Sequence, residues 1–487
     1  MSTALPAGTW RIGENGELRL RAPDTVRTTV TLLEGSAEML GVELLQARPV
    51  VLPPGQSRPV FTFHGAVVRV EPASSCEDAY VADESTFPAL AAVNSRLEAR
   101  RALARGTVGG LPADTASAAA GSADKAAPLG PVVVVAGPVN AGKSTAVATL
   151  AAWACRRGWS PTVVDLDPGQ GDLCPPASVS AAPVDRIGLA ASGGWETHAL
   201  PILSYPVGTT NLGEAAPLFK AACASLAAAV QARASAGAPA GSASGAIVNT
   251  CGWVDKLGYT LLCHVIETFN ADVVLVLGDD ALFARLSRDL PAIAPPPTPE
   301  QVAAAGAAAV PVSGPTRVAL VKLPVSGGAR RREPSERQAA RAGRIREYFY
   351  GPPVAPPAAP AGASAAPPAA PEPLLSPLST TLSFDSVRLV KVGGSETASH
   401  QLPVGASSQL SALRVTALDP SPALEGSLLA LSSATSPARA ATASLLGFAV
   451  ITTVNTEKRE LVLQLPTAQH LPAPALFIVT SERYSDA

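Results

Sequence analysis

The feature that most constrains this chain is the stretch PVVVVAGPVNAGKST at residues 131–145. Residues 137–145 fit the phosphate-loop pattern G-x-x-x-x-G-K-[ST], with Gly137, Gly142, Lys143 and Ser144 in the fixed places. Glycines allow the backbone N–H groups of such a loop to turn toward a phosphate, and the N-terminus of the following helix adds positive potential. The stretch therefore predicts a strand, a nucleotide-binding loop and a helix in direct succession.

The same loop indicates which residues hold the nucleotide. The Lys143 ammonium is placed to meet the β and γ oxygens of a nucleotide, and the Ser144 hydroxyl is placed to ligate Mg²⁺. The alternative is a glycine-rich turn without a ligand, which the strand and helix around the loop argue against. The expected nucleotide contacts are Gly137, Asn140, Ala141, Gly142, Lys143, Ser144 and Thr145.

Around the loop, apolar runs alternate with helical stretches, which is the pattern of a parallel sheet covered on both faces. The predicted strands are 131–137, 161–167, 245–253, 271–278 and 316–323, and the predicted helices include 143–157 and 258–270. The central part of the chain is therefore expected to be a three-layer α/β domain.

The flanking parts of the chain are expected to be β-rich. Residues 17–72 carry short β-branched runs broken by Gly, Pro and Asn-Gly, which favours an N-terminal β-sandwich, and residues 88–105 read as a helix. The expected division begins with an N-terminal domain at 1–105, a linker at 106–129 and a phosphate-loop domain at 130–350 that ends in a helix at 335–350. A disordered Pro/Ala insertion at 351–377 and a C-terminal β-rich domain at 378–487 follow.

Composition excludes several classes of protein. With 487 residues and 47% hydrophobic content, the chain is long enough for two or three packed cores. The net charge of −2 gives no global basic field, so a nucleic-acid site must be a local basic patch. The six cysteines include no C-x-x-C pair, which argues against disulfides and structural zinc. We expect neither a signal peptide nor a membrane span, and hence a soluble intracellular protein.

The stretch PTVVDLDPGQGD supplies candidate acidic groups at the end of the second strand. Asp165 and Asp167 both lie there, and Asp167 is the better candidate to reach a metal or to accept the proton of an attacking hydroxyl because it is last in the strand. Gln170 is placed to orient the nucleophile or a metal-bound water. The alternative is an Asp-Pro-Gly turn that simply ends the strand.

An aromatic residue follows a later strand, where a GTPase would carry an N-K-x-D element that this chain lacks. The stretch there is NTCGWVDKLGY, and Trp253 is expected at the active-site edge, where its indole could stack on a nucleobase. The alternative is that Trp253 belongs to the core.

The stretch SERQAARAGRIREYFYG at residues 335–351 reads as a helix with a capping box of Ser335 and Gln338. Arg337, Arg341 and Arg344 share one face, and Arg346 lies to its side. Like charges on one face repel unless an anion gathers them, so the helix is either a solvated surface helix or a lid that grips phosphate.

Several of these motifs together resemble a known family. GPxxxGKST, DLDPGQG, NTCGWV followed by GY, and IREYFYG, in this order, are similar to the eukaryotic polyribonucleotide 5′-hydroxyl kinase family of the pre-mRNA cleavage and polyadenylation machinery. TLLEGSAEMLGVEL and FTFHG resemble its N-terminal domain, and LLGFAVITTVNTEKRELVLQLP its C-terminal domain. The similarity covers nearly the whole chain apart from the Pro/Ala insertion.

The resemblance implies transfer of the ATP γ-phosphate to the 5′-hydroxyl of RNA, with Mg²⁺ as the metal. It also implies other subunits of the cleavage and polyadenylation complex as partners, the tRNA splicing endonuclease as a further partner, and a nuclear location. On the donor side it assigns phosphate and metal contacts to Lys143 and Ser144, the general base or metal ligand to Asp167, lid roles to Arg341 and Arg346, and contact with the nucleobase of ATP to Arg58. On the acceptor side it assigns RNA stacking to Trp253 and RNA contacts to Thr209 and Thr210. These two threonines lie in YPVGTTN, where the family has a T-P-G-T clasp.

Two other functions stay open at this stage. Some members of the family bind ATP without transferring phosphate and act as scaffold subunits, although this chain keeps the loop Lys, the strand-end Asp, the Trp and the lid Arg. A GTPase that also carries a strand-end LDP is a more distant alternative, and the missing guanine-reading element argues against it.

Overall fold

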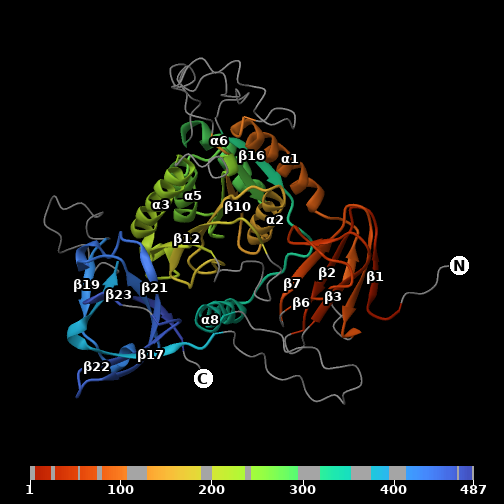
Figure 1. Cartoon of the computed structure of the whole chain (residues 1–487). Coiled ribbons are helices and arrows are strands. Elements are labelled where there is room, and N and C mark those ends of the chain that lie inside the picture. The colour runs from red at the N-terminus through yellow and green to blue at the C-terminus, as the bar shows by residue number, and fades with distance from the viewer. Residues whose placement is uncertain are drawn as a thin grey trace, which may run out of the picture.

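The computed structural model has three bodies: an N-terminal sandwich, a central sheet covered by helices, and a C-terminal sheet. Figure 1 shows them coloured from the red N-terminus to the blue C-terminus. The structure describes residues 6–23, 28–52, 55–73, 79–106, 129–187, 200–235, 243–293, 318–351, 375–393, 413–468 and 471–484. Most of the linker at 106–129 and of the Pro/Ala insertion at 351–377 lies outside these residues, so the predictions made for those two segments do as well.

The N-terminal body is a sandwich of two sheets, as predicted. One sheet has the order β1-β8-β3-β6 and the other β5-β4-β7-β2-β9, and their paired strands are antiparallel. Leu18, Val60, Val68 and Val70 are fully buried between them because apolar residues alternate along these strands. The strands are Thr9–Ile12 (β1), Glu17–Arg21 (β2), Thr28–Gly35 (β3), Glu38–Met39 (β4), Val42–Glu43 (β5), Val50–Leu52 (β6), Ser57–Phe61 (β7), Ala66–Glu71 (β8) and Tyr80–Ala82 (β9).

The central sheet has the order β13-β12-β11-β14-β10-β15-β16. The five predicted strands are adjacent and parallel, and they appear as Val132–Ala136 (β10), Thr162–Leu166 (β11), Ala246–Thr250 (β14), Val273–Leu277 (β15) and Ala319–Leu323 (β16). Two antiparallel strands, Ser178–Pro183 (β12) and Leu203–Pro206 (β13), extend the sheet beyond β11 and were not predicted. Neither SVSAAP nor LSYP has the continuous run of large apolar residues that identified the others.

Helices cover both faces of this sheet. Residues of α2 (Lys143–Arg156) and α1 (Phe87–Ala104) pack in one apolar cluster, together with the N-terminal sandwich. Residues of α3 (Leu212–Ser235), α5 (Leu257–Thr268) and α6 (Asp280–Ile293) pack in the cluster on the other face. The predicted three-layer α/β domain is therefore confirmed.

Helix α3 is long and apolar enough to cross a membrane by length and composition alone, with a mean hydropathy of 1.3 over its best window. In the structure its large apolar residues Leu218, Phe219 and Leu226 are fully buried, and the helix packs along β11, β12, β13 and α5. Alanine supplies much of its hydropathy. The helix is accordingly a core helix of the central domain.

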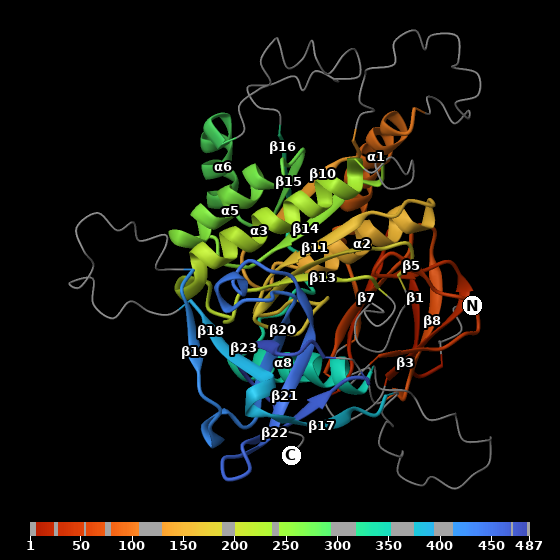
Figure 2. The ribbon, with the colours of Figure 1, turned by 60° about the vertical axis from the view of Figure 1, so that its left-hand side comes forward.

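The C-terminal body is a seven-stranded sheet of order β17-β22-β21-β20-β23-β18-β19. Neighbouring strands in this sheet pair antiparallel, except for β18 and β23, which are parallel to each other. Helix α8 (Pro334–Tyr350) lies against it in Figure 2, and Ile345 and Phe349 are buried in its core. The strands are Leu378–Ser383 (β17), Val387–Val392 (β18), Val415–Leu418 (β19), Ser427–Ser432 (β20), Leu445–Asn455 (β21), Glu460–Leu465 (β22) and Ala475–Arg483 (β23).

The start of α8 differs from the prediction. The capping box expected from Ser335 and Gln338 is wrong, because Glu333 is the N-cap and Glu336 the residue that reaches back to it. Pro334 takes the first helical position, where a missing N–H and a fixed φ are favourable. The N-cap therefore lies two residues earlier than the Ser-x-x-Gln pattern indicated.

Candidate active site

One large cavity, of about 930 Å³, lies at the carboxyl ends of the parallel strands. In open α/β sheets this edge is where ligands bind. The phosphate loop, the segment after β11, the segment after β14, the N-terminal strand β7 and helix α8 all contribute to its wall. The N-terminal sandwich, the central domain and α8 therefore line the cavity directly. The C-terminal sheet packs against α8 and supports it from behind.

The phosphate loop has the backbone conformation that its sequence predicts. Strand β10 ends at Ala136 and α2 begins at Lys143, so the loop spans the turn between them. Gly137 has φ of +150°, and a Cβ there would come within 2.7 Å of the Leu277 carbonyl oxygen. Gly142 has φ of +89°, the left-handed region in which glycine has no steric penalty. The predicted ATP contacts from Asn140 to Thr145 all line the cavity, whereas Gly137 is not among its lining residues.

Lys143 is the buried cation of the site. Its Nζ donates to the carbonyl oxygens of Gly137, at 3.0 Å, and Pro138, at 2.8 Å. Burial lowers the pKa of Lys143, and the neighbouring charge of Asp167 opposes this effect. An ammonium with three donors, held at the loop and only 8% exposed, is arranged to meet phosphate oxygens in a place from which water is largely excluded.

Two carboxylates follow β11 and have different surroundings. Asp165 accepts hydrogen bonds from the backbone N–H groups of Asp167 and Asp172 and from the Asn249 amide. Burial, followed by the charge of Asp172, raises the pKa of Asp165 to about 7. Asp165 does not line the cavity, whereas Asp167 does. Asp165 therefore fixes the segment, and Asp167 faces the reaction space.

Asp167 also shapes the turn that follows it. Its Oδ1 accepts the backbone N–H groups of Gly169 and Gln170, each at 3.0 Å. Burial raises the pKa of Asp167, while these two hydrogen bonds and the Lys143 charge lower it. Asp167 thus both stabilises the Asp-Pro-Gly turn and presents a carboxylate to the cavity. A structural role in the turn and a role in the reaction therefore do not exclude each other.

The residues present fit a Mg²⁺ ion held together with a nucleotide. Among the described residues no cluster of three or more His, Cys, Asp or Glu could hold a metal by itself. Mg²⁺ in kinase sites is usually bound by one or two carboxylates or hydroxyls and by substrate phosphates, with several waters. Ser144 and Asp167, which both line the cavity, supply that kind of incomplete oxygen set.

Trp253 lies in the cavity wall and is 37% exposed. The segment after β14 presents it there because glycines flank it closely: a Cβ on Gly258 would come within 2.5 Å of its ring, and one on Gly213 within 3.8 Å. A core position is therefore wrong for this residue, and one side of its indole is available for stacking.

The basic face of α8 is turned toward the cavity. Arg337, Arg341, Arg344 and Arg346 all line it. Their charges are partly compensated: Arg341 Nε donates to Glu482 Oε2 at 3.0 Å, and Arg344 pairs with Asp172 at 3.3 Å and with Glu347 at 2.8 Å.

Arg346 and Arg337 complete this face. The guanidinium of Arg346 lies 5.4 Å from the centre of the Tyr350 ring, and the Arg337 carbonyl oxygen accepts a hydrogen bond from the Gln170 amide at 3.2 Å. Gln170 thus joins the turn after β11 to α8, and its predicted role in orienting the nucleophile or a water stays a prediction.

The remaining predicted contacts are placed unequally. Arg58 lines the cavity from β7, and burial lowers its pKa to about 10 against the raising effect of Asp172. Thr210 lines the cavity as well, and its hydroxyl donates to Glu482 Oε1 at 3.3 Å. Thr209 is not among the described lining residues, and its hydroxyl accepts the Asn211 N–H at 3.1 Å, a bond that fixes the loop.

Sequence reasoning missed four polar residues that complete the site: Asp172, Asn211, Asn249 and Glu482. The first three belong to the quoted stretches PTVVDLDPGQGD, YPVGTTN and NTCGWVDKLGY, so position within a motif was an available signal. Glu482 lies near the C-terminus, and no local pattern connects it to the phosphate loop.

Comparison with known proteins gives a consistent result along the chain. Residues 137–304 match the family described as mRNA cleavage and polyadenylation factor CLP1 P-loop. Residues 375–486 match Pre-mRNA cleavage complex II protein Clp1, and residues 11–104 match the N-terminal beta-sandwich domain of polyadenylation factor. All three bodies of the structure are therefore represented.

Similar proteins cover almost the full length. The chain is 32% identical to Protein CLP1 homolog of Arabidopsis thaliana, over 96% of this chain and 92% of that protein. It is 31% identical to Polyribonucleotide 5′-hydroxyl-kinase Clp1 of Xenopus tropicalis, over 97% and 94%. A solved complex of Clp1p with a Pcf11p fragment has the same fold, with a TM-score of 0.72 at 20% identity and coverage of 98% and 97%. With three matching domains in the same order and relatives above 30% identity over nearly the whole length, this chain belongs to the Clp1 family.

Proposed function

We propose that this chain is an ATP-dependent polynucleotide 5′-hydroxyl kinase that acts on RNA and is a subunit of the pre-mRNA 3′-end cleavage and polyadenylation complex. The name of the Xenopus tropicalis relative, a polyribonucleotide 5′-hydroxyl-kinase, supports the activity, and the solved Clp1p–Pcf11p complex supports the role as a subunit. The observation that carries the proposal is that one cavity contains the phosphate-loop cation Lys143, the strand-end carboxylate Asp167 and the half-exposed ring of Trp253.

Each of these groups has a step in the transfer. Lys143 and the loop N–H groups hold the β and γ phosphates and meet the charge that develops on the transferred group. Asp167, in the wall of the same cavity, accepts the proton of the 5′-hydroxyl as it attacks. Trp253 stacks on the terminal base, which positions that hydroxyl.

The arginines of α8 belong to the donor side. Arg341 and Arg346 are positioned to stabilise the γ-phosphoryl group, and Arg58 closes the cavity from the N-terminal sandwich beside the nucleotide. Ser144 and Asp167 would hold Mg²⁺ together with the nucleotide, and the ion would supply positive charge that neutralises the phosphates. Thr210 and Asn211 line the acceptor side, where they are available to the RNA backbone.

The proposal extends to partners and location. The tRNA splicing endonuclease is proposed as a further partner and the nucleus as the location, in line with an activity on RNA ends. The second candidate is an ATP-bound scaffold subunit. The observation that favours it is that Arg341 and Arg344 already have carboxylate partners, so the basic face does not require a phosphate to compensate its charge.

End-labelling tests the proposal. The purified full chain is incubated with γ-labelled ATP, Mg²⁺ and an RNA that bears a 5′-hydroxyl, and Lys143→Ala is the matched control. We expect labelled RNA from the unchanged protein and a loss of at least about 100-fold for the variant, because a contact to developing charge is worth about 3 kcal/mol or more. Unlabelled GTP should compete poorly with ATP. Tight ATP binding without any labelling would favour the scaffold.

A further inference from the structure

Glu482, near the end of β23, stands directly behind two residues of the cavity wall. Its Oε2 accepts from Arg341 Nε at 3.0 Å, and its Oε1 accepts from the Thr210 hydroxyl at 3.3 Å. Glu482 itself is not one of the described residues that line the cavity, whereas Arg341 and Thr210 both are. One carboxylate thus holds a donor-side cation and an acceptor-side hydroxyl at the same time.

The ion pair between Arg341 and Glu482 is partly buried and has a defined geometry. The Arg341 and Glu482 side chains are 25% and 15% exposed, so the interaction is screened less than a surface ion pair. Only Nε of Arg341 is engaged, and within the part of the chain that the structure describes Glu482 is its one ion-pair partner. The remaining N–H groups of the guanidinium are therefore left for phosphate oxygens.

The backbone around Glu482 is fixed from two sides. The N–H of Ser481 donates to the Gly208 carbonyl oxygen at 2.9 Å, which joins the end of β23 to the loop that contains Thr210. The Glu482 N–H donates to the Thr480 hydroxyl, and that hydroxyl donates to the Leu428 carbonyl oxygen inside the C-terminal sheet. Glu482 therefore transmits the position of the C-terminal sheet to both sides of the cavity.

We infer that Glu482 is a positioning residue that sets the distance between the lid cation Arg341 and the RNA-side loop at Thr210, and so couples nucleotide binding to RNA binding. The expected effect on kcat rests on the proposed kinase function. The expected effect on the coupling between nucleotide and RNA binding does not require phosphate transfer. A carboxylate on Nε restricts the guanidinium to one orientation, and small errors in the placement of such a group are costly in phosphoryl transfer. The carboxylate itself does not contact the reacting atoms.

The kinetic test compares Glu482→Gln with the unchanged full-length protein. The glutamine keeps the size and an oxygen that accepts from Thr210, but it loses the charge that holds Arg341. We expect kcat to fall about tenfold to 100-fold, with the KM for ATP changed less than about threefold. Asp385→Asn is the matched control, because it removes a carboxylate from an exposed ion pair with Arg459 in the turns of the same C-terminal body, and it should leave both constants unchanged.

A double-mutant cycle separates positioning from general damage. If Glu482 acts through Arg341, Glu482→Gln has little additional effect on kcat in a protein that already carries Arg341→Ala. Additive losses, or an unchanged kcat for Glu482→Gln in an active protein, would overturn the inference. A higher kcat for Glu482→Gln would overturn it too, since the carboxylate would then restrain Arg341 in an unproductive place.

A binding measurement keeps the inference testable even if no phosphate is transferred. The affinity of a fluorescent 5′-hydroxyl RNA is measured with and without a non-hydrolysable ATP analogue, and the ratio is the coupling between the two sites. We expect the analogue to strengthen RNA binding severalfold in the unchanged protein and in Asp385→Asn, and to have much less effect in Glu482→Gln and Glu482→Ala. The same ratio in all proteins, or no RNA binding at all, would refute the inference, whereas absent transfer with intact coupling would refute only the kinase activity.

Discussion

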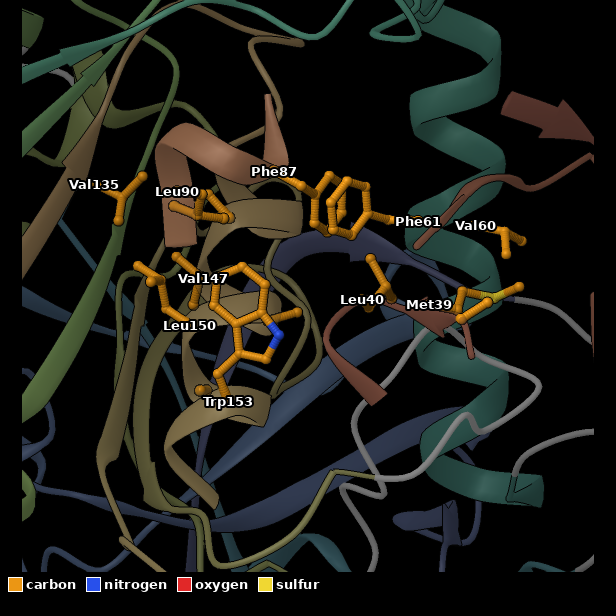
Figure 3. Packing of buried hydrophobic residues seen from close by; sticks show 14 of the residues in the cluster. Met39, Leu40, Val60, Phe61, Phe87, Leu90, Val135, Val147, Leu150 and Trp153 are labelled. Atoms are coloured by element: carbon orange, nitrogen blue, oxygen red, sulfur yellow. The ribbon is translucent and has the colours of Figure 1, made fainter. Parts of the chain in front are cut away.

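The indole N–H of Trp153 in α2 donates to Oε1 of Glu38 in the N-terminal sandwich at 2.9 Å, and Arg156 pairs with Oε2 of the same carboxylate at 2.7 Å. Figure 3 shows the apolar surroundings, in which Trp153, Phe87 and Phe61 come together between the two bodies. Because α2 begins at the phosphate loop, this buried contact fixes the sandwich, and with it Arg58, relative to the nucleotide site.

The first prediction concerns the pH dependence of stability at Glu38. Burial raises the pKa of the Glu38 carboxyl above its ordinary value of 4.5, against the opposing effects of Trp153 and Arg156. A carboxyl whose pKa is raised in the folded protein stabilises the fold at pH below its pKa in the unfolded chain. This contribution is lost as the pH rises through its pKa in the folded protein. Glu38→Gln removes the titration, so its stability relative to the unchanged protein should rise with pH from about 4.5 upward.

Melting temperatures of both proteins between about pH 4 and about pH 8 check this sign. Glu43→Gln is the control for loss of charge, since Glu43 is 59% exposed and pairs with the same Arg156. A difference that shrinks with rising pH would mean that the ion pair with Arg156 outweighs the cost of burial.

The second prediction separates the two roles of Asp167. Asp167→Asn keeps an oxygen that accepts the N–H groups of Gly169 and Gln170, so the melting temperature should change little. Transfer should fall at least about 100-fold, because the base is lost. Asp167→Ala should lose transfer as well and, in addition, lower the free energy of unfolding by about 1–3 kcal/mol, because two turn N–H groups lose their acceptor. Labelling assays and thermal melts of both variants measure this; equal destabilisation by Asn and Ala would make the carboxylate charge structural.

The third prediction concerns the acceptor side. Trp253→Ala should raise the KM for RNA by about tenfold or more, since stacking of a base on an aromatic ring is worth about 1–3 kcal/mol. The affinity for ATP should not change. Because Trp253 is 37% exposed, stability should change by no more than about 0.5 kcal/mol. Leu446→Ala, at a 54% exposed apolar residue of β21, is the control for loss of surface area. A weaker ATP affinity in Trp253→Ala would assign the indole to the adenine instead.

The fourth prediction tests whether the C-terminal sheet holds α8 in place. Phe349 of α8 and Phe477 of β23 are both fully buried, but only Phe349 lies in the cluster that α8 shares with the sheet. Either change to Ala should cost about 3–5 kcal/mol of stability. At a temperature at which both variants are folded, Phe349→Ala should lose transfer more strongly than Phe477→Ala, because the arginines of α8 lose their support. Equal activities would show that α8 does not depend on this anchor.

Much of the nucleotide site was determined by local sequence. The run of valines at β10, the glycines of the loop and Lys143 act within a few residues of one another, so their pattern predicts their geometry. The same holds for Asp167 at the end of β11 and for the arginine spacing along α8, because strand ends and helical periodicity are properties of short segments.

The tertiary structure alone decided what those local elements contact. Whether Trp253 was core or cavity wall depended on α3 and on the segment after β14. Strand β12 extends the sheet by pairing with β11, and β13 pairs in turn with β12. Arg341 meets a carboxylate 141 residues further along the chain, and Tyr348 accepts the Phe448 N–H across 100 residues. Such contacts bring together groups whose separation in sequence carries no periodicity, so the position of α8, and with it the role of Glu482, follows from the packing of the C-terminal sheet and not from any motif.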